Sequence, residues 1–327
     1  MMKKLITPII YIGVLGWLQA QQLPQYSLYM LNPYAFNPAV AGTENTLILN
    51  GVYRQQWSDL QGAPVGQSLN AHLPVYKINS GLGLRLDNNT MGAHRATQAA
   101  LSYSFQVEIG RSALLSLGVS GGYMQYALDG AKLRAPQGTY SEPGGLFTHN
   151  DNLLPEGNIN AGTVFGEAGI FFRRKALQAG LAVQPVFAPV LEPTSGGAFR
   201  LKPARHYVFT AGYNLPIGDD LELRPSFLAK TDFSVTQLEI SALFNWRSFI
   251  FAGASLRGVT RQARDAAVVL IGWQINERST AAYAYDLPLS ALNTVNRGSH
   301  ELMLRYSLNK PVGRGTLPPV IYNPRFW

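Results

Sequence analysis

Three polar residues near the C-terminal end of the chain have the types that a Ser–His–acid hydrolase uses: Ser299, His300 and Asp286. In such a site the serine attacks an acyl carbon, the histidine takes the serine proton, and the acid orients the histidine. Ser299 and His300 are neighbours in an alternating segment, and neighbouring side chains on a strand point to opposite faces. We therefore predict that the side chains of Ser299 and His300 do not converge on one site. Instead, they belong to a polar strand end that hydrogen-bonds to its neighbouring strand.

Other matches to catalytic or metal sites are equally weak. Gly118-Val119-Ser120-Gly121-Gly122 has the letters of a nucleophile elbow, but the elbow needs a strand-to-helix turn, and Ser120 lies within an alternating run. The five histidines are scattered without metal-ligand spacing. Asp129, Asp151 and Glu156 share one long segment, where calcium binding and simple solvation are both open. We predict that the protein has no catalytic residue, binds no cofactor and is not an enzyme.

The composition excludes several classes of protein. The chain has 327 residues, of which 46% are hydrophobic and 14% charged, against about 25% charged in typical soluble domains. Cysteine is absent, which excludes disulfides, a zinc ribbon and a thiol catalyst. An aromatic content of 11% with so little charge argues against disorder.

Residues 1–20 have the features of a secretory signal peptide. Lys3 and Lys4 precede an apolar stretch, and Ala20 suits cleavage before Gln21. The alternative, a membrane anchor, is disfavoured because the stretch is short and no charged stop follows it. Without a following cysteine the product is not a lipoprotein. Losing Lys3 and Lys4 reduces the formal charge from +8 to +6, so no nucleic-acid partner is indicated.

Beyond residue 45 the chain alternates between apolar and polar residues, which indicates half-buried β-strands. The segment Thr97–Glu108, for example, places Leu101, Tyr103 and Phe105 on one face and mostly small or polar residues on the other. About fourteen such segments occur, an even number, as bacterial single-chain barrels require. The predicted strands are 45–57, 65–76, 80–88, 95–108, 111–127, 161–173, 176–188, 204–214, 220–230, 235–246, 249–257, 263–275, 278–287 and 299–308.

The connections between these strands sort into two kinds. Connections after even-numbered strands are short, whereas those after odd-numbered strands include 128–160, 189–203 and 288–298. Short turns on one side and long loops on the other are typical of outer-membrane barrels. This sorting predicts that both termini are periplasmic.

A soluble antiparallel protein such as a jelly roll is the alternative. Its outer surface needs more charge than 14% of residues supply. On the apolar faces a basic residue at the bilayer midplane would cost ~2–4 kcal/mol. Charged residues instead fall on the polar faces of the strands: Arg85, Asp87, Glu108, Glu167, Arg173, Arg224, Glu239, Arg264 and Arg305. Aromatic residues near strand ends predict interfacial girdles: Tyr53, Trp57, Tyr103, Phe171, Trp246, Phe249 and Trp273.

The sequence therefore predicts an all-β, transmembrane antiparallel β-barrel in the outer membrane over residues 45–308. Two proline-rich segments flank it: residues 21–44 and the tail 309–327. We predict that residues 21–44 dock on the lumen or on the periplasmic mouth, because their large apolar side chains would be costly in water. The docking candidates are Tyr26, Tyr29, Met30, Tyr34 and Phe36. The tail is predicted to be periplasmic.

An ordered set of motifs resembles the PorP/SprF family of Bacteroidetes outer-membrane proteins. The first blocks are Gln25-Tyr26 to Tyr29-Met30, Asn32-Pro33, Asn37-Pro38-Ala39-Val40-Ala41-Gly42, and Tyr53-Arg54-Gln55-Gln56-Trp57 with Gly62-Ala63-Pro64. Later blocks are Gly81-Leu82-Gly83-Leu84, Tyr283-Ala284-Tyr285-Asp286, Gly298-Ser299-His300-Glu301-Leu302 and Pro324-Arg325-Phe326. Asn323 departs from the pattern, which often has cysteine there.

The resemblance implies a role in type IX secretion and gliding. It implies as partners a secreted cargo or adhesin with a type IX C-terminal domain, and periplasmic ring or peptidoglycan-binding lipoprotein components. We expect a non-enzymatic barrel that delivers or holds such a partner at the cell surface. Its contact would be the long loop 128–160, through Tyr140, Leu146, Phe147, Leu153 and Leu154. The competing hypothesis is a passive porin or hydrophobic-solute channel.

Overall fold

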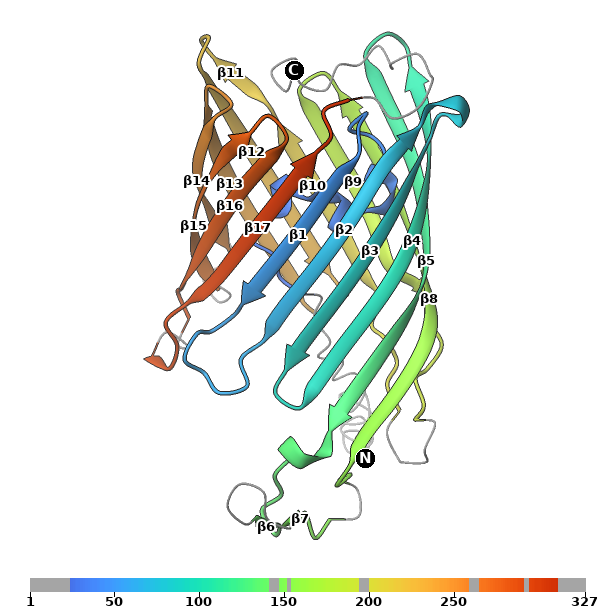
Figure 1. The fold of residues 1–327 in the computed structure, drawn as a ribbon, viewed down its shortest axis with the longest axis vertical. Helices are drawn as coiled ribbons and strands as arrows, with labels where there is room; N and C mark the ends of the chain where they lie inside the picture. Colours follow the sequence, from blue (N-terminus) through green and yellow to red (C-terminus); the bar gives the residue numbers. More distant parts are fainter. Residues whose placement is uncertain are drawn as a thin grey trace, which may run out of the picture.

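The computed structural model describes residues 24–140, 147–151, 154–193, 200–258, 265–290 and 294–310. Fourteen antiparallel strands form one closed barrel (Figure 1). In chain order they are β1 (Ile48–Gln55), β2 (Val65–Val75), β3 (Ser80–Met91), β4 (His94–Ile109), β5 (Ala113–Asp129), β8 (Asn158–Arg174), β9 (Leu177–Phe187), β10 (His206–Tyr213), β12 (Leu221–Thr231), β13 (Thr236–Trp246), β14 (Ile250–Arg257), β15 (Ala266–Asn276), β16 (Ser279–Pro288) and β17 (Ser299–Ser307). The predicted fold class is confirmed, and no strand boundary differs from its predicted position by more than three residues.

One pairing between strands that are distant in the sequence closes the barrel: β1 pairs with β17, with Ile48 opposite Ser307. The consecutive barrel strands β10 and β12 pair directly, with Tyr207 opposite Thr231. The short β11 (Leu215–Ile217) lies beside β12 past the end of β10. A separate hairpin consists of β6 (Thr139–Tyr140) and β7 (Phe147–Thr148). Closure pairs the backbone groups of the strands with one another, as a lipid environment requires.

The barrel has a short-turn end, uppermost in Figure 1, and a long-loop end. The short-turn end carries the connections 76–79, 110–112, 175–176, 214–220, 247–249 and 277–278. The long-loop end carries 56–64, 92–93, 130–157, 188–205, 232–235, 258–265 and 289–298. β1 begins and β17 ends at the short-turn end. The periplasmic location of both chain termini stays a prediction.

The outer face of β4 shows the membrane-facing belt. Its outward side chains from Ala99 to Ile109 are apolar, and those of Leu101 and Phe105 are 68% and 45% exposed. At the usual strand rise and a tilt of roughly 40°, this run covers about 25 Å, the height of an outer-membrane belt. Toward the long-loop end, the next outward residues are Thr97 and Arg95. The ends of β4, β5 and β8 therefore project beyond the belt (Figure 1).

Two members of the predicted aromatic girdle lie elsewhere. Phe171 was predicted to face lipid, but it is 3% exposed and packs inside the barrel against Tyr34. Alternation in β8 places Phe171 on the inward face with Glu167 and Arg173. The girdle prediction is wrong for Phe171 because it uses the aromatic type and the place near a strand end, not the face. Trp57 lies beyond the end of β1 at the mouth of the lumen.

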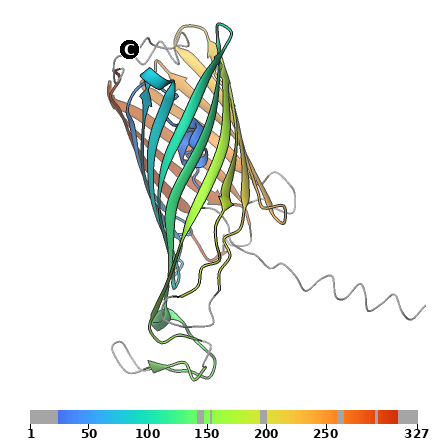
Figure 2. The same ribbon diagram turned by 90° about the vertical axis from the view of Figure 1, so that its right-hand side faces the viewer.

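Residues 24–44, which we call the lumen segment, run through the interior of the barrel (Figure 2). Three short 3-10 helices shape it: η1 (Tyr29–Leu31), η2 (Pro33–Phe36) and η3 (Pro38–Val40). Pro33 and Pro38 begin η2 and η3, where the missing N–H has no helical partner to lose. Within the described part of the chain, no helix is long and apolar enough to cross a membrane.

Candidate functional site

At the long-loop end of the lumen, Ser27 joins the lumen segment to charged residues of the wall. Its Oγ donates to Asp286 Oδ1 at 2.6 Å and accepts from Arg54 Nη1 at 2.8 Å and Arg257 Nη2 at 2.7 Å. Its backbone N–H donates to Glu301 Oε2 at 2.6 Å. We call Ser27, Arg54, Arg257, Asp286 and Glu301 the latch. All five are 2% exposed or less.

The charged members of the latch also pair with one another. Arg54 lies 2.5 Å from Asp286 and 2.9 Å from Glu301. Arg257 lies 2.8 Å from Asp286 and 2.7 Å from Glu239. Desolvating buried charges costs several kcal/mol per ion, which their attraction largely repays, whereas removal of one partner is strongly destabilising. The latch therefore fixes a position more than it adds net stability.

In the middle of the lumen, the predicted docking residues contact the inner wall. The Tyr29 hydroxyl lies 3.0 Å from Ser241 Oγ, and the Tyr34 hydroxyl lies 2.8 Å from Ser102 Oγ. Phe36 is 4% exposed and packs in one cluster with Tyr29 and with wall residues of β10 and β12. Tyr26 and Met30 are half-buried and pack against the same cluster. All five candidates thus lie inside the barrel.

The wall has small residues where η3 approaches it most closely. A Cβ added to Gly118 would overlap the backbone of Ala39, and one added to Gly81 would overlap the carbonyl of Ala41. Asn37 caps η3 by accepting from the Ala39 N–H at 2.9 Å, and Pro38 is its first residue. Gly118, the first glycine of the apparent nucleophile elbow, therefore has a packing role. Ser120 of the same motif lies inside β5.

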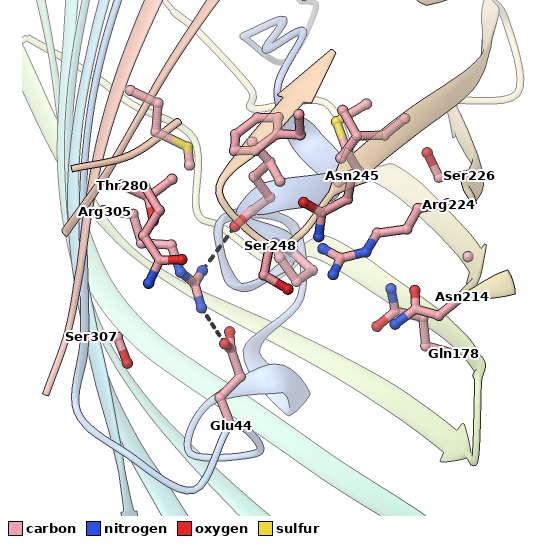
Figure 3. Close-up of a pocket in the computed structure, with 18 of the residues that line it drawn as sticks. Glu44, Gln178, Asn214, Arg224, Ser226, Asn245, Ser248, Thr280, Arg305 and Ser307 are labelled. Atoms are coloured by element: carbon pink, nitrogen blue, oxygen red, sulfur yellow. Dashed lines mark hydrogen bonds and ion pairs between the residues drawn. The ribbon is translucent and has the colours of Figure 1, made fainter. Parts of the chain in front are cut away.

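At the short-turn end, Arg305 holds the other end of the lumen segment. It pairs with Glu44 and donates to the Leu31 carbonyl at 2.9 Å (Figure 3). A cavity of about 250 Å³ opens beside this pair. Met30 and Leu31 contribute apolar surface to it, and amide and guanidinium side chains surround them: Gln178, Asn214, Arg224, Asn245 and Arg305. The cavity thus combines apolar surface with hydrogen-bonding amide and guanidinium groups.

A second cavity, of about 360 Å³, lies at the long-loop mouth. Gln25, Trp57 and Lys230 line it together with latch residues. The backbone N–H of Trp57 donates to Ser299 Oγ at 3.2 Å. On the rim, the backbone N–H of Val235 holds the pKa of the Asp232 carboxyl below its usual value, so this carboxyl stays ionised at neutral pH.

The three residues with triad chemistry belong to separate sets of contacts. Ser299 is 5% exposed and belongs to the lumen lining, and Asp286 is part of the latch. The His300 ring lies on the other face of β17, with Nδ1 2.6 Å from the Tyr283 hydroxyl and its ring 5.0 Å from that of Tyr285. The structure therefore does not bring a triad together. In the described residues, no group of three His, Asp or Glu is placed to hold a metal ion.

The long loop has a folded base. His149 is 1% exposed, and its Nδ1 lies 3.0 Å from the Tyr140 hydroxyl. Its Nε2 lies 3.0 Å from the Gly130 carbonyl, next to the β5 end. Tyr140 and Phe147 are opposite one another in the β6–β7 hairpin and remain half-buried. Leu154 is also half-buried, whereas Leu146 and Leu153 lie outside the described residues.

The motif blocks found in the sequence contain some residues of the latch but not all of them. Arg54, Asp286 and Glu301 belong to three separate motif blocks, and the structure brings them together around Ser27. Arg257 has no motif, and only its place on the inward face of β14 could have indicated a role. Two further motif residues, Arg325 and Phe326, lie outside the described residues.

Comparison with known proteins identifies one family. The model described as "Type IX secretion system membrane protein PorP/SprF" matches residues 18–306. No curated protein matches the sequence.

Several solved barrels are similar to this chain at low identity. Omp33, an outer membrane protein of Acinetobacter baumannii, is 8% identical over 82% of this chain and 100% of that chain, with a TM-score of 0.46. The Ralstonia pickettii toluene transporter TbuX is 9% identical over 85% and 92%, with a TM-score of 0.46. The CymD monoaromatic hydrocarbon channel is 11% identical over 87% and 92%, also at 0.46. Similarities this distant carry no argument about function.

Proposed function

Since the chain belongs to the PorP/SprF family of type IX secretion system membrane proteins, we propose that this outer-membrane β-barrel delivers or holds a secreted cargo or adhesin at the cell surface without catalysing a reaction. The observation that carries the proposal is the filled lumen. Residues 24–44 contact the wall at both ends and in the middle. A barrel filled in this way suits a protein that binds a partner through its loops.

The filled lumen also weighs against the competing function, a passive porin or hydrophobic-solute channel. The inner wall carries apolar patches, and Leu28, 1% exposed, is buried against one that includes Leu243 and Val268. A water-filled channel requires a polar lining. The wall is therefore complementary to the lumen segment rather than to water.

The long loop is the proposed contact for the secreted partner. Its base is held by His149, and the hairpin presents Tyr140 and Phe147 partly to solvent, beyond the lipid belt. Half-exposed aromatic residues on an ordered scaffold are suited to become anchors of a protein interface. We propose a cargo or adhesin with a type IX C-terminal domain as the occupant.

The short-turn end is the proposed contact for the periplasmic machinery, namely ring or peptidoglycan-binding lipoprotein components. The cavity beside Arg305 and Glu44 opens there. The tail with Arg325 and Phe326 follows Lys310, which lines the same cavity. The lining of this cavity supports binding of a peptide segment on the side that we assign to the periplasm.

A loop exchange tests the surface contact. Asp129 and Asn158 are opposite one another across β5 and β8, so a two-residue Asn-Gly turn can replace residues 130–157 and still close a hairpin. The matched control makes the same exchange for 232–235, where Thr231 is opposite Thr236. We expect surface display of the cargo to be lost in the first variant and kept in the second. Unchanged display in a folded first variant would contradict the proposal.

Planar-bilayer recordings test the competing function. We expect the intact protein to give no large, steady single-channel currents, because the lumen segment fills the barrel. A variant that lacks residues 24–44 but keeps its signal peptide should conduct if it folds. Large, steady currents from the intact protein would favour the porin.

A further inference from the structure

The lumen segment crosses the barrel in a defined direction. Ser27 is bound by Arg54, Asp286 and Glu301. Each of these lies within two residues of the long-loop end of its strand: β1 ends at Gln55, β16 ends at Pro288, and β17 begins at Ser299. Ser27 therefore lies at the long-loop end of the lumen.

The other end of the segment lies at the opposite mouth. Glu44 pairs with Arg305, two residues before β17 ends at Ser307. Thr46 donates to the carbonyl of Lys310, the last described residue, at 3.0 Å. β1 then begins at Ile48 at the short-turn end. The chain thus enters the lumen at the long-loop mouth and leaves it at the short-turn mouth.

The residues before Ser27 continue outward at the long-loop mouth. The Gln25 side chain lies 3.5 Å from that of Gln56, which follows the end of β1. The Pro24 carbonyl accepts from Lys230 at 3.4 Å, one residue before the end of β12. Gln25 and Lys230 line the cavity at this mouth together with Ser290, which lies beyond the end of β16. The first described residue is therefore already at the opening of the lumen.

We propose that the mature N-terminus is presented at the long-loop mouth, on the cell-surface side, while the chain after β17 leaves at the short-turn mouth. The predicted cleavage after Ala20 would leave three residues before Pro24, and three extended residues reach at most ~10 Å. The lipid belt alone is about 25 Å tall. The new N-terminus therefore cannot return to the periplasmic mouth past the lumen segment, in contrast to the expectation that both termini are periplasmic.

This arrangement adds an element to the cell-surface face. Gln25, four residues after the predicted new N-terminus, lies beside the connections 56–64, 232–235 and 289–298 through the cavity that it lines, at the same end of the barrel as the β6–β7 hairpin. A protein partner that covers this face therefore meets a free chain end beside the latch. The inference uses the lumen path and the outward orientation of the long loops. It does not depend on the identity of the cargo.

The absence of cysteine allows a direct test, because each single-cysteine variant of the full-length protein labels at one position. Gln22→Cys probes the N-terminus, Lys132→Cys the long loop, and Arg111→Cys a short turn. We expect a membrane-impermeant maleimide to label Q22C and K132C on intact cells, and R111C only after the outer membrane is permeabilised. Labelling of Q22C only after permeabilisation, or in neither condition, would overturn the proposal. Reversed labelling of K132C and R111C would overturn the orientation itself.

A cross-link tests the lumen path independently of membrane sides. The double variant Gln25→Cys/Gln56→Cys replaces side chains whose terminal amide atoms lie 3.5 Å apart, so a short bis-maleimide should bridge the two thiols within one chain. The control, Gln25→Cys/Gln178→Cys, pairs Gln25 with a residue lining the short-turn cavity and should stay unlinked. A cross-link in the control but not in the first variant would place the entry of the segment at the wrong mouth and overturn the proposal.

Discussion

The two ends of the lumen segment are held in different ways. At the long-loop end, Ser27 lies among four charged wall residues that are 2% exposed or less. At the short-turn end, the side chains of Arg305 and Glu44 are 18% and 16% exposed and border an open cavity. The loss of an ionic partner costs most where water cannot replace it. The latch therefore fixes the segment, whereas the short-turn end can adjust.

The strongest way to break the latch is Arg54→Met. It removes the guanidinium that pairs with both Asp286 and Glu301, and these carboxylates are buried. We expect the free energy of unfolding to fall by about 3–5 kcal/mol. Urea unfolding in lipid vesicles, followed by tryptophan fluorescence, measures it. The matched control is Arg305→Met, for which we expect a smaller loss because water reaches that site. Equal losses would show that the two ends do not differ.

A steric change tests the middle of the segment, between the two ends. Gly118→Val places a side chain where the backbone of Ala39 lies, so η3 must move. Overpacking of this kind costs about 1–3 kcal/mol. Gly121→Val is the control in the same strand, since a Cβ at Gly121 meets no atom within 4 Å. The same unfolding assay should show a loss for G118V alone. A similar loss for both variants would point to a strand effect rather than to the lumen segment.

The sequence predicts the barrel well and the latch poorly, for a physical reason. Lipid outside and a lumen inside impose a period of two on every strand, so alternation alone locates the strands. The latch joins Ser27 to Asp286, 259 positions apart, and depends on the register between β1, β17 and β16. Alternation within a strand contains no information about that register. The wrong face predicted for Phe171 has a different origin. Alternation groups it with the inward Glu167 and Arg173, but the girdle prediction uses only its aromatic type and its place near a strand end.

A smaller effect is expected for a single hydrogen bond in the middle of the lumen. The Tyr34 hydroxyl lies 2.8 Å from Ser102 Oγ, which also contacts Ser120 at 2.7 Å. Tyr34→Phe leaves Ser102 with a partner, so we expect a loss of about 1 kcal/mol. Ser102→Ala leaves the Tyr34 hydroxyl buried without that partner, and an orphaned polar group costs about 1–3 kcal/mol. If Y34F proved the more costly of the two, ring packing rather than the hydrogen bond would hold the middle of the segment.

The smallest effect is expected at the short-turn end, from Glu44→Gln. The amide oxygen still accepts from Arg305, and only the charge is lost from a pair that is partly exposed, so we expect a loss below about 1 kcal/mol. Asp286→Asn makes the same chemical change at the latch, where one carboxylate serves both Arg54 and Arg257. Hydrogen bonds between charged groups are worth about 1.5–3 kcal/mol, so the D286N loss should be clearly larger. If E44Q cost as much as D286N, burial would not explain how the two ends differ, and the short-turn end would be a second fixed point.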